Sequence, residues 1–427
     1  MKDTFFKSTI ILLIGGLLTK VLGMVIKVIM TRCVGVEGIA LYMLVFPTFS
    51  LFMTISQMGL TTAISKTISE YTHNNKNIVL SIIPISLLFN ILLILIVLII
   101  SPILSKVLND ERTLLPIMSI ALVLPIDSIS NILRGYFFGR QKMLPHILSL
   151  LTEQIIRLFL IIDFIPNILY KGITVTVSYL IGINMISEFI SVLVLLLFIK
   201  NKKISKKNLI PQKKEIASIF SIAVPTTLSR LIGSISYFFE PIIITSLLSI
   251  NGYSIDNIIE EYGLIEGFVL PLLLMPSFLT NALSSALIPD IAKKYVKKDI
   301  WTIKRRMKQI IKISLIIGIA VSIILYINPS FYLNIIYKTT KGSNYLRVLT
   351  PFFILLYIQY PFESILQGIN KSKNIMKNNI IGIISKISII TILSFFHIGL
   401  YNLIIGIIIN ISITTYLHYK KIKEVLY

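Results

Sequence analysis

The sequence contains few of the residues on which most enzymes and metalloproteins depend. Its 427 residues include one cysteine, Cys33, and four histidines. A single cysteine excludes an internal disulfide and a cysteine-rich metal site, and the histidines are not spaced like metal ligands. No nucleotide-binding P-loop, G-x-S-x-G sequence or histidine–acid cluster occurs. We therefore expect a protein that is not an enzyme and that needs no metal or other cofactor.

Charge is also scarce: 14% of the residues are charged and 55% are hydrophobic. A soluble domain of this length would need more charge to cover its surface. Apolar runs of about 20 residues, the length that crosses a bilayer, recur from end to end. The sequence predicts an all-α polytopic membrane protein with twelve spans, at 9–30, 40–65, 78–104, 114–133, 147–162, 174–199, 217–248, 263–290, 313–327, 347–370, 380–395 and 401–416.

The charges that do occur are mostly basic, with a formal net charge of +22, and they are unevenly placed. Alternate loops, starting with residues 1–8, hold 29 lysines and arginines, whereas the other set of loops holds 6. The positive-inside rule places the basic loops and both termini in the cytoplasm. Nucleic acid is not expected as a partner, because no folded extramembrane domain is present to bind it.

The most basic segment follows the sixth span and divides the chain in two. We predict an N-terminal six-helix lobe at 1–199, a cytoplasmic linker at 200–216 and a C-terminal six-helix lobe at 217–427. An even number of spans in each half predicts two bundles related by a pseudo-two-fold axis along the membrane normal.

The two halves also resemble each other locally. Leu17–Gly23 aligns with Thr227–Gly233, and the Leu-Arg-Gly sequence that ends at Gly135 aligns with the Leu-Gln-Gly sequence that ends at Gly368. Either match alone is short, but the two occur in the same order in both halves. They favour an internal repeat.

Two lysines lie inside the first predicted span. Lys20 and Lys27 are seven residues apart, so they lie on one line of a helix together with Gly16 and Gly23. A charge near the bilayer centre is disfavoured by roughly 2.5 to 17 kcal/mol. We therefore expect this line to border a polar cavity, and Arg230 occupies the matching place in the second half. Snorkelling or pairing with a carboxylate is the alternative. Cations in a cavity favour an anionic substrate such as a phosphate or diphosphate.

Further charged residues are candidates for ion coupling or for structural ion pairs. Glu153 and Arg157 have the i, i+4 spacing of an ion pair within one helix. Asp127, Asn131 and Arg134 form a line on the fourth span, where we expect Arg134 at the water interface.

Isolated charges within or near other spans have several possible roles. Four single acids are of this kind: Glu188, Glu240, Glu266 and Glu363. Each is a candidate proton or cation site, and each is equally a candidate counter-charge to the cavity lysines; the sequence leaves both roles open. Asp290 and Lys386 lie near predicted span ends and are expected at the interface.

Several motifs together resemble one family. They include Leu133–Gln141 (LRGYFFGRQ), Glu153–Arg157 (EQIIR), Val36–Tyr42 (VEGIALY) and Leu270–Pro276 (LPLLLMP). These sequences are similar to the stage V sporulation protein B group of polysaccharide exporters. That group belongs to the multidrug/oligosaccharidyl-lipid/polysaccharide (MOP) exporter superfamily, together with the lipid II flippase MurJ and the Wzx flippases.

The resemblance implies a flippase of the bacterial plasma membrane, with two six-helix lobes around a cationic cavity. Such a protein moves a lipid-linked sugar diphosphate, a peptidoglycan or polysaccharide precursor, to the outer leaflet by alternating access. Lys20, Lys27 and Arg230 match the cationic positions of that pattern. Relatives commonly have fourteen helices, so the last pair is expected to be missing here, and Glu266 stands where MurJ-like proteins carry arginine.

The resemblance also implies membrane lipids as partners, wall-synthesis enzymes as candidate partners, and a role in cell-wall synthesis or sporulation. Two other functions stay open: a cation-coupled multidrug antiporter of the same fold, and a scaffold for wall synthesis that transports nothing. An antiporter would use acids of the first lobe such as Asp127 and Glu153. The cationic first helix disfavours it, because like charges repel.

Overall fold

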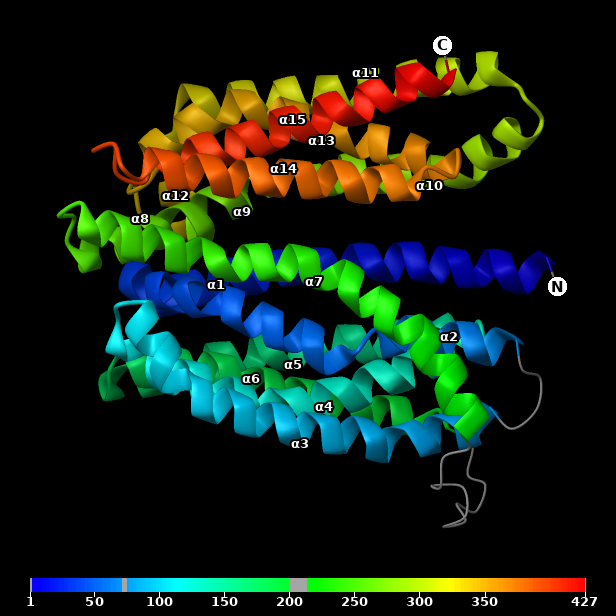
Figure 1. The fold of residues 1–427 in the computed structure, drawn as a ribbon, viewed down its shortest axis with the longest axis horizontal. Coiled ribbons are helices and arrows are strands. Elements are labelled where there is room, and N and C mark those ends of the chain that lie inside the picture. The colour runs from blue at the N-terminus through cyan, green and yellow to red at the C-terminus, as the bar shows by residue number, and fades with distance from the viewer. Residues whose placement is uncertain (1, 71–74, 200–212, 427) are drawn as a thin grey trace. The chain divides into compact units, whose positions relative to one another are not determined.

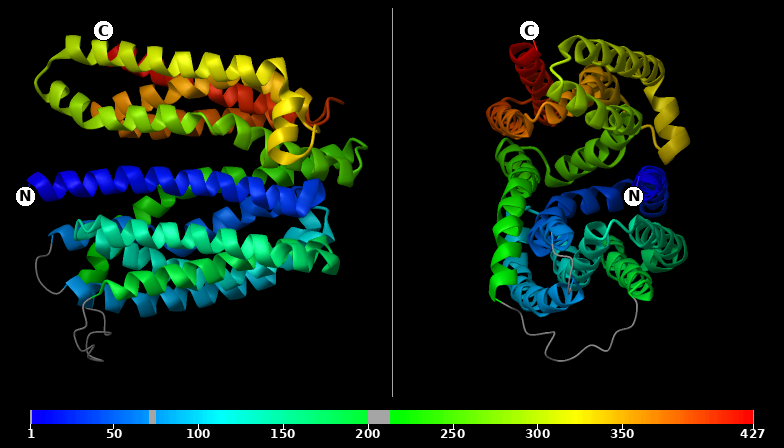
Figure 2. Two further views of the ribbon diagram at one scale, coloured as in Figure 1. Left: turned by 180° about the vertical axis from the view of Figure 1, so that it is seen from behind. Right: turned by 90° about the vertical axis from the view of Figure 1, so that its right-hand side faces the viewer.

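A computed structural model describes residues 2–70, 75–199 and 213–426, and in these ranges all regular structure is helical. The chain divides into two compact units, Met1–Phe239 and Glu240–Tyr427. Within each unit the helices run roughly along one direction, as Figure 1 and Figure 2 show. This confirms the all-α class. The boundary between the units lies inside α7, which begins at Lys213, and most of the predicted linker, 200–212, lies outside the described residues.

The helices of the first unit, with α7 crossing into the second, are α1 (Lys2–Gln57), α2 (Leu60–Glu70), α3 (Asn75–Val107), η1 (Glu111–Thr113), α4 (Leu114–Gly139), α5 (Met143–Ile168), η2 (Leu169–Lys171), α6 (Ile173–Leu197) and α7 (Lys213–Ile250). Those of the second unit are α8 (Ile255–Leu264), the π-helix η4 (Ile265–Val269), α9 (Leu270–Leu274), α10 (Ser277–Val296), α11 (Ile300–Ile327), α12 (Pro329–Tyr337), α13 (Ser343–Gly368), α14 (Ser372–Leu393) and α15 (Tyr401–Leu426).

The first predicted span and most of the second are parts of α1. They are separated at Gly35, whose backbone (φ 70°, ψ −171°) is not helical. Glycine adopts this positive φ readily because it has no Cβ. The chain turns back on itself there (Figure 1). The element α1 therefore contains two crossings.

Nine helices within the described ranges are long and apolar enough to cross a membrane, and the bent pair α8–α10 would be a tenth. The remaining predicted spans are accounted for by the turn at Gly35 and by α5, which carries the charged residues Glu153, Arg157 and Asp163. Every predicted span falls on helical structure, with ends that differ by a few residues.

Two predicted spans are broken. The span at 40–65 is interrupted at Met58 and Gly59, which both have positive φ, and a Cβ on Gly59 would lie 2.8 Å from the carbonyl oxygen of Ala223 on α7. The span at 263–290 contains the π-helix η4 and a second break before α10, where the axis bends by 48°. Such π segments often mark functional sites.

Apolar side chains cover the outside of the helices and small polar ones lie inside. On α3, Leu88 is 71% exposed and Ile99 is 70% exposed. On the opposite side of α3 the buried Asn90 accepts a hydrogen bond from Ser56 Oγ at 2.6 Å. An apolar exterior with hydrogen-bonded polar groups between helices is the arrangement expected of a bundle that faces lipid.

Gly135 and Gly368, which align in the internal repeat, have the same packing role in their own units. A Cβ on Gly135 of α4 would lie 2.8 Å from the carbonyl oxygen of Thr61 on α2. A Cβ on Gly368 of α13 would lie 2.7 Å from Ile291 Cγ2 on α10. Each glycine therefore lets a long helix approach a neighbouring helix at one end of the unit. This equivalence is what an internal repeat would produce.

Candidate functional site

The cationic stripe on α1 is formed by Gly16, Lys20, Gly23 and Lys27. Lys20 is exposed and Lys27 is half-buried. A Cβ placed on Gly16 or on Gly23 would meet no atom of the described residues within 4 Å. The stripe therefore borders open space, although the neighbouring Gly15 packs tightly against Ile147 of α5.

Arg230 on α7 has the same kind of surroundings. It is exposed, and a Cβ on Gly233 next to it would also meet nothing within 4 Å among the described residues. The Oγ atoms of Ser234 and Thr54 are hydrogen-bonded at 2.9 Å, which holds this part of α7 against α1. Arg230, Lys20 and Lys27 all lie in the compact unit Met1–Phe239.

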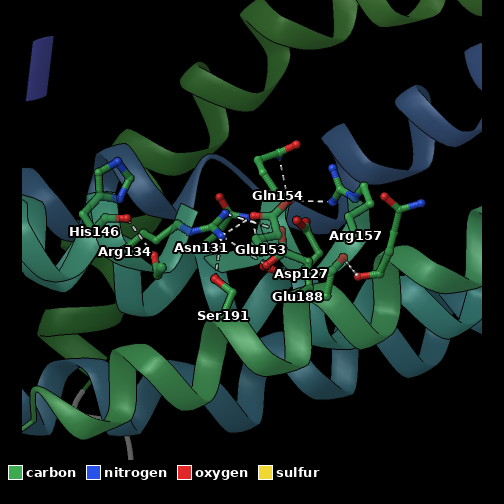
Figure 3. A network of polar contacts seen from close by, with 12 residues as sticks. Asp127, Asn131, Arg134, His146, Glu153, Gln154, Arg157, Glu188 and Ser191 are labelled. Atoms are coloured by element: carbon green, nitrogen blue, oxygen red, sulfur yellow. Dashed lines mark hydrogen bonds and ion pairs between the residues drawn. The ribbon is translucent and has the colours of Figure 1, made fainter. Parts of the chain in front are cut away.

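A buried ion network lies deeper in the same unit, between α4, α5 and α6 (Figure 3). We call it the Arg134 network; its members are Asp127, Arg134, Glu153, Arg157, Glu188 and Ser191. Arg134 Nη2 donates to Glu153 Oε2 at 2.7 Å, to Ser191 Oγ at 2.9 Å and to Glu188 Oε2 at 3.2 Å. One guanidinium group thus joins three helices.

The pair of Glu153 and Arg157 that the i, i+4 spacing predicts is present, with Arg157 Nη2 at 2.6 Å from Glu153 Oε1. The expectation that Arg134 lies at the water interface is wrong, because only 7% of it is exposed. Two carboxylates on neighbouring helices compensate its charge, and this allows it to be buried.

Asp127 completes the network on the α4 side. It is 2% exposed and faces the side chains of Gln57 and Asn131. Its Oδ2 has no hydrogen-bond partner among the described residues. The carboxylate is close enough to Arg134 to act on it electrostatically.

The second unit contains its own buried ion pair. Lys386 Nζ of α14 lies 2.5 Å from Glu240 Oε2 of α7, with side chains that are 15% and 2% exposed. Glu266 is 9% exposed in the π-helix η4 and acts electrostatically on Lys386. The expected interfacial position of Lys386 is therefore wrong, since Glu240 compensates its charge inside the bundle.

Sequence reasoning did not assign the partners of these buried acids. Glu188 and Glu240 were recognised as isolated acids near spans, and in the structure they pair with Arg134 and Lys386. The signal that was available is the presence of ionisable residues inside apolar spans, which usually pair with one another. In the described ranges no group of three or more histidine, cysteine or acidic residues could hold a metal ion.

Comparisons with known proteins assign the family. Residues 5–295 match the polysaccharide biosynthesis protein family and residues 241–392 match the MatE family. Stage V sporulation protein B of Bacillus subtilis (strain 168) is 34% identical over 405 residues, which cover 92% of this chain and 78% of that protein. The lipid II flippase MurJ of the same organism is 24% identical, over 91% of this chain and 77% of that protein.

The fold has solved counterparts. The inward-facing structure of a multidrug resistance MATE family transporter of the MOP superfamily matches with a TM-score of 0.75 and 17% identity, over 96% of this chain and 94% of that chain. Together with the apolar helices, these matches identify a multi-pass membrane protein. The chain belongs to the polysaccharide biosynthesis protein family, and it has the fold of a MATE family transporter.

Proposed function

We propose that the protein moves a lipid-linked, diphosphate-bearing cell-wall or polysaccharide precursor from the cytoplasmic to the outer leaflet of the bacterial plasma membrane. The observation that carries this proposal is the stripe on α1, where Lys20 and Lys27 alternate with glycines that border open space. Lysine binds phosphate oxygens as a compact positive charge. Arg230 adds a group that can bind two phosphate oxygens at once.

The named activity of one relative agrees with this substrate class. MurJ is a lipid II flippase and is 24% identical to this chain. The excess of basic residues in alternate loops favours cytoplasmic termini, so the substrate would be bound on the cytoplasmic side and released outside by alternating access. Wall-synthesis enzymes, which make or use such precursors, are proposed partners.

A cation-coupled drug antiporter is the second candidate, and the geometry disfavours it. Glu153 already accepts hydrogen bonds from two arginines, and Glu188 from one. Acids that are occupied by guanidinium groups are poor ligands for an organic cation. A scaffold that transports nothing would not need a lysine stripe in an apolar helix.

The test is translocation in proteoliposomes that contain a fluorescent polyprenyl-diphosphate sugar, with quenching from outside as the readout. We expect Lys20→Ala, Lys27→Ala and Arg230→Ala each to lower the rate by about tenfold or more, the effect of losing roughly 1.4 kcal/mol of phosphate binding. Lys106→Ala, at the last turn of α3, is the matched control and should keep the wild-type rate. If all three variants translocate as fast as the control, the stripe does not bind the substrate.

The same variants should be compared in cells that are depleted of their native flippase. Rescue by the wild type and by Lys106→Ala, but not by the stripe variants, would support the proposal. Failure of the wild type to rescue, combined with resistance to cationic dyes, would support the antiporter instead.

A further inference from the structure

The Arg134 network contains more acids than bases. Asp127, Glu153 and Glu188 contribute three carboxyl groups, and Arg134 and Arg157 contribute two guanidinium groups. The three acids and Arg134 are each at most 7% exposed. If every group were ionised, one uncompensated negative charge would be buried between α4, α5 and α6, which is strongly unfavourable.

We propose that the Arg134 network binds one exchangeable proton, shared by the carboxyl groups of Glu153 and Glu188, and that this proton is the coupling ion of the transporter. The coupling part rests on the proposed transport function, whereas the proton site itself does not. With one proton bound, three acids and two arginines are electrically neutral.

The contacts place the proton at Glu153 and Glu188. Their carboxyl groups are within hydrogen-bonding reach of each other, and both bind Nη2 of Arg134. Two carboxylates in contact repel each other unless one of them is protonated and donates to the other. Asp127 faces Gln57 and Asn131, and its Oδ2 has no hydrogen-bond partner among the described residues.

The ionisable groups that act on the site lie on α1, α4, α5 and α6. The ionisable side chains are Tyr42 on α1, Asp127 and Arg134 on α4, His146, Glu153 and Arg157 on α5, and Glu188 on α6. Tyr42 is near Arg157, and His146 is near Arg134. A proton on His146 would therefore be repelled by Arg134, which leaves the carboxyl pair as the place where a proton is stabilised.

A metal cation does not suit this site. Glu153 Oε1 accepts from Arg157 Nη2 at 2.6 Å, and its Oε2 accepts from Arg134 Nη2 at 2.7 Å. Both oxygens of Glu188 lie 3.2 to 3.4 Å from nitrogens of Arg134. A sodium ion would have to displace these guanidinium groups and lie next to their positive charge. A proton needs only one lone pair on one oxygen.

Loss of the proton would change the packing of α5 against α6. When the proton leaves to water, two facing carboxylates remain, with Arg134 bound to both and Arg157 bound to Glu153. Their repulsion favours separation of the two helices, and rebinding of a proton reverses it. The network can thereby bias a two-state transport equilibrium through protonation.

Infrared difference spectroscopy of the purified full-length protein in lipid tests the proton site without any substrate. We expect the wild type to show a protonated carboxyl C=O band that disappears as the pH is raised and shifts in heavy water. Glu188→Gln should lose this band, whereas Glu37→Gln, at an acid whose side chain is 63% exposed, should keep it. Glu153→Gln is the second assignment variant in case Glu188→Gln does not fold.

The outcomes are distinct. A wild type without a titrating protonated carboxyl band overturns the proposal whatever the variants do. A band that sodium ions remove at constant pH also overturns it, because the site would then bind a metal cation. A band that is unchanged in well-folded Glu188→Gln and Glu153→Gln places the proton elsewhere and refutes the assignment.

Translocation in proteoliposomes tests the coupling. A gradient of about one pH unit should change the wild-type translocation ratio by about tenfold, since one pH unit is about 1.4 kcal/mol per proton. Glu188→Gln should show no response to the gradient, and Glu37→Gln should respond as the wild type does. A titrating band without any translocation would mean that the proposed function fails and the proton site holds. Translocation that ignores the gradient in the wild type would refute the coupling.

Discussion

Lys386 of α14 and Glu240 of α7 are 146 residues apart in the chain, and their side chains meet as a buried ion pair with 2.5 Å between Nζ and Oε2. The pair joins two helices of the unit Glu240–Tyr427. Glu240 Oε1 has no hydrogen-bond partner among the described residues, so Lys386 is the main compensation for this carboxylate.

Removing one member of this pair should destabilise the protein more than removing both. Lys386→Met leaves the carboxylate of Glu240 buried without its counter-ion, and we expect a loss of about 3–5 kcal/mol. The double variant Glu240→Leu/Lys386→Met should recover most of that loss, because no unpaired charge remains at this pair. Thermal unfolding in detergent measures both. Equal losses in the single and double variants would show that the pair acts through packing and not through charge.

Gly135 should not tolerate a methyl group. A Cβ there would lie 2.8 Å from the carbonyl oxygen and 3.1 Å from the Cα of Thr61, and backbone atoms cannot move aside cheaply. We expect Gly135→Ala to cost about 1–3 kcal/mol. Gly182→Ala in α6 is the control, since a Cβ there would meet nothing within 4 Å among the described residues. The control should be neutral or slightly stabilising, because alanine favours a helix over glycine. Comparable losses in both variants would contradict the proposed close approach.

Features that depend on residues close together in the chain could be predicted from the sequence. Hydropathy located all twelve spans, and the i, i+4 spacing located the pair of Glu153 and Arg157. The alignment of the halves located Gly135 and Gly368, which turned out to have the same packing role. In each case the signal is a period or a short motif within a few helical turns.

Features that depend on how each helix is rotated could not be predicted. Arg134 and Glu188 are 54 residues apart, and nothing in either helix shows that their side chains face each other. The exposed apolar surface of a lipid-facing helix weakens the usual distinction between an inner and an outer face. The break at Met58 and the π-helix η4 were also missed, because apolar composition is the same in a straight and a broken span.

Asp299 should stabilise the start of α11 in a pH-dependent manner. The N–H of Thr302 donates to Asp299 Oδ1 at 3.1 Å, and hydrogen bonds from the Thr302 side chain and then from its N–H lower the pKa of the carboxyl below its usual 3.8. The contribution of a lowered carboxyl pKa is fully present above the unfolded value and is lost as the pH falls through the folded value. Asp299→Ala should therefore speed amide exchange at Thr302 at neutral pH, and the difference from wild type should vanish in acid below 3.8.

The substitution Asp299→Asn keeps an N-cap side chain at the start of α11 and removes its negative charge. Asparagine is also a good N-cap, so this variant should protect Thr302 nearly as well as aspartate at neutral pH. Its protection, corrected for the intrinsic exchange rate, should not change between neutral and acidic pH. If the protection of the Thr302 amide in the wild-type protein is unchanged at low pH, the charge of the Asp299 carboxylate does not contribute to it.

Substitutions at the adjacent glycines Gly15 and Gly16 of α1 should have different effects, one on stability and the other on the rate of transport. Gly15 packs on Ile147 of α5, where a Cβ would overlap the isoleucine side chain, whereas Gly16 borders open space on the stripe. We expect Gly15→Ala to lower thermal stability by about 1–3 kcal/mol. Gly16→Leu should leave stability within about 0.5 kcal/mol, the usual range for a substitution away from packed contacts. Because leucine would occupy the space beside Lys20, Gly16→Leu should still slow translocation of the fluorescent polyprenyl-diphosphate sugar about tenfold or more. Gly16→Ala, which adds only a methyl group, should keep most of the rate. If Gly16→Leu is stable and translocates at the wild-type rate, the space beside the stripe is not part of the substrate path.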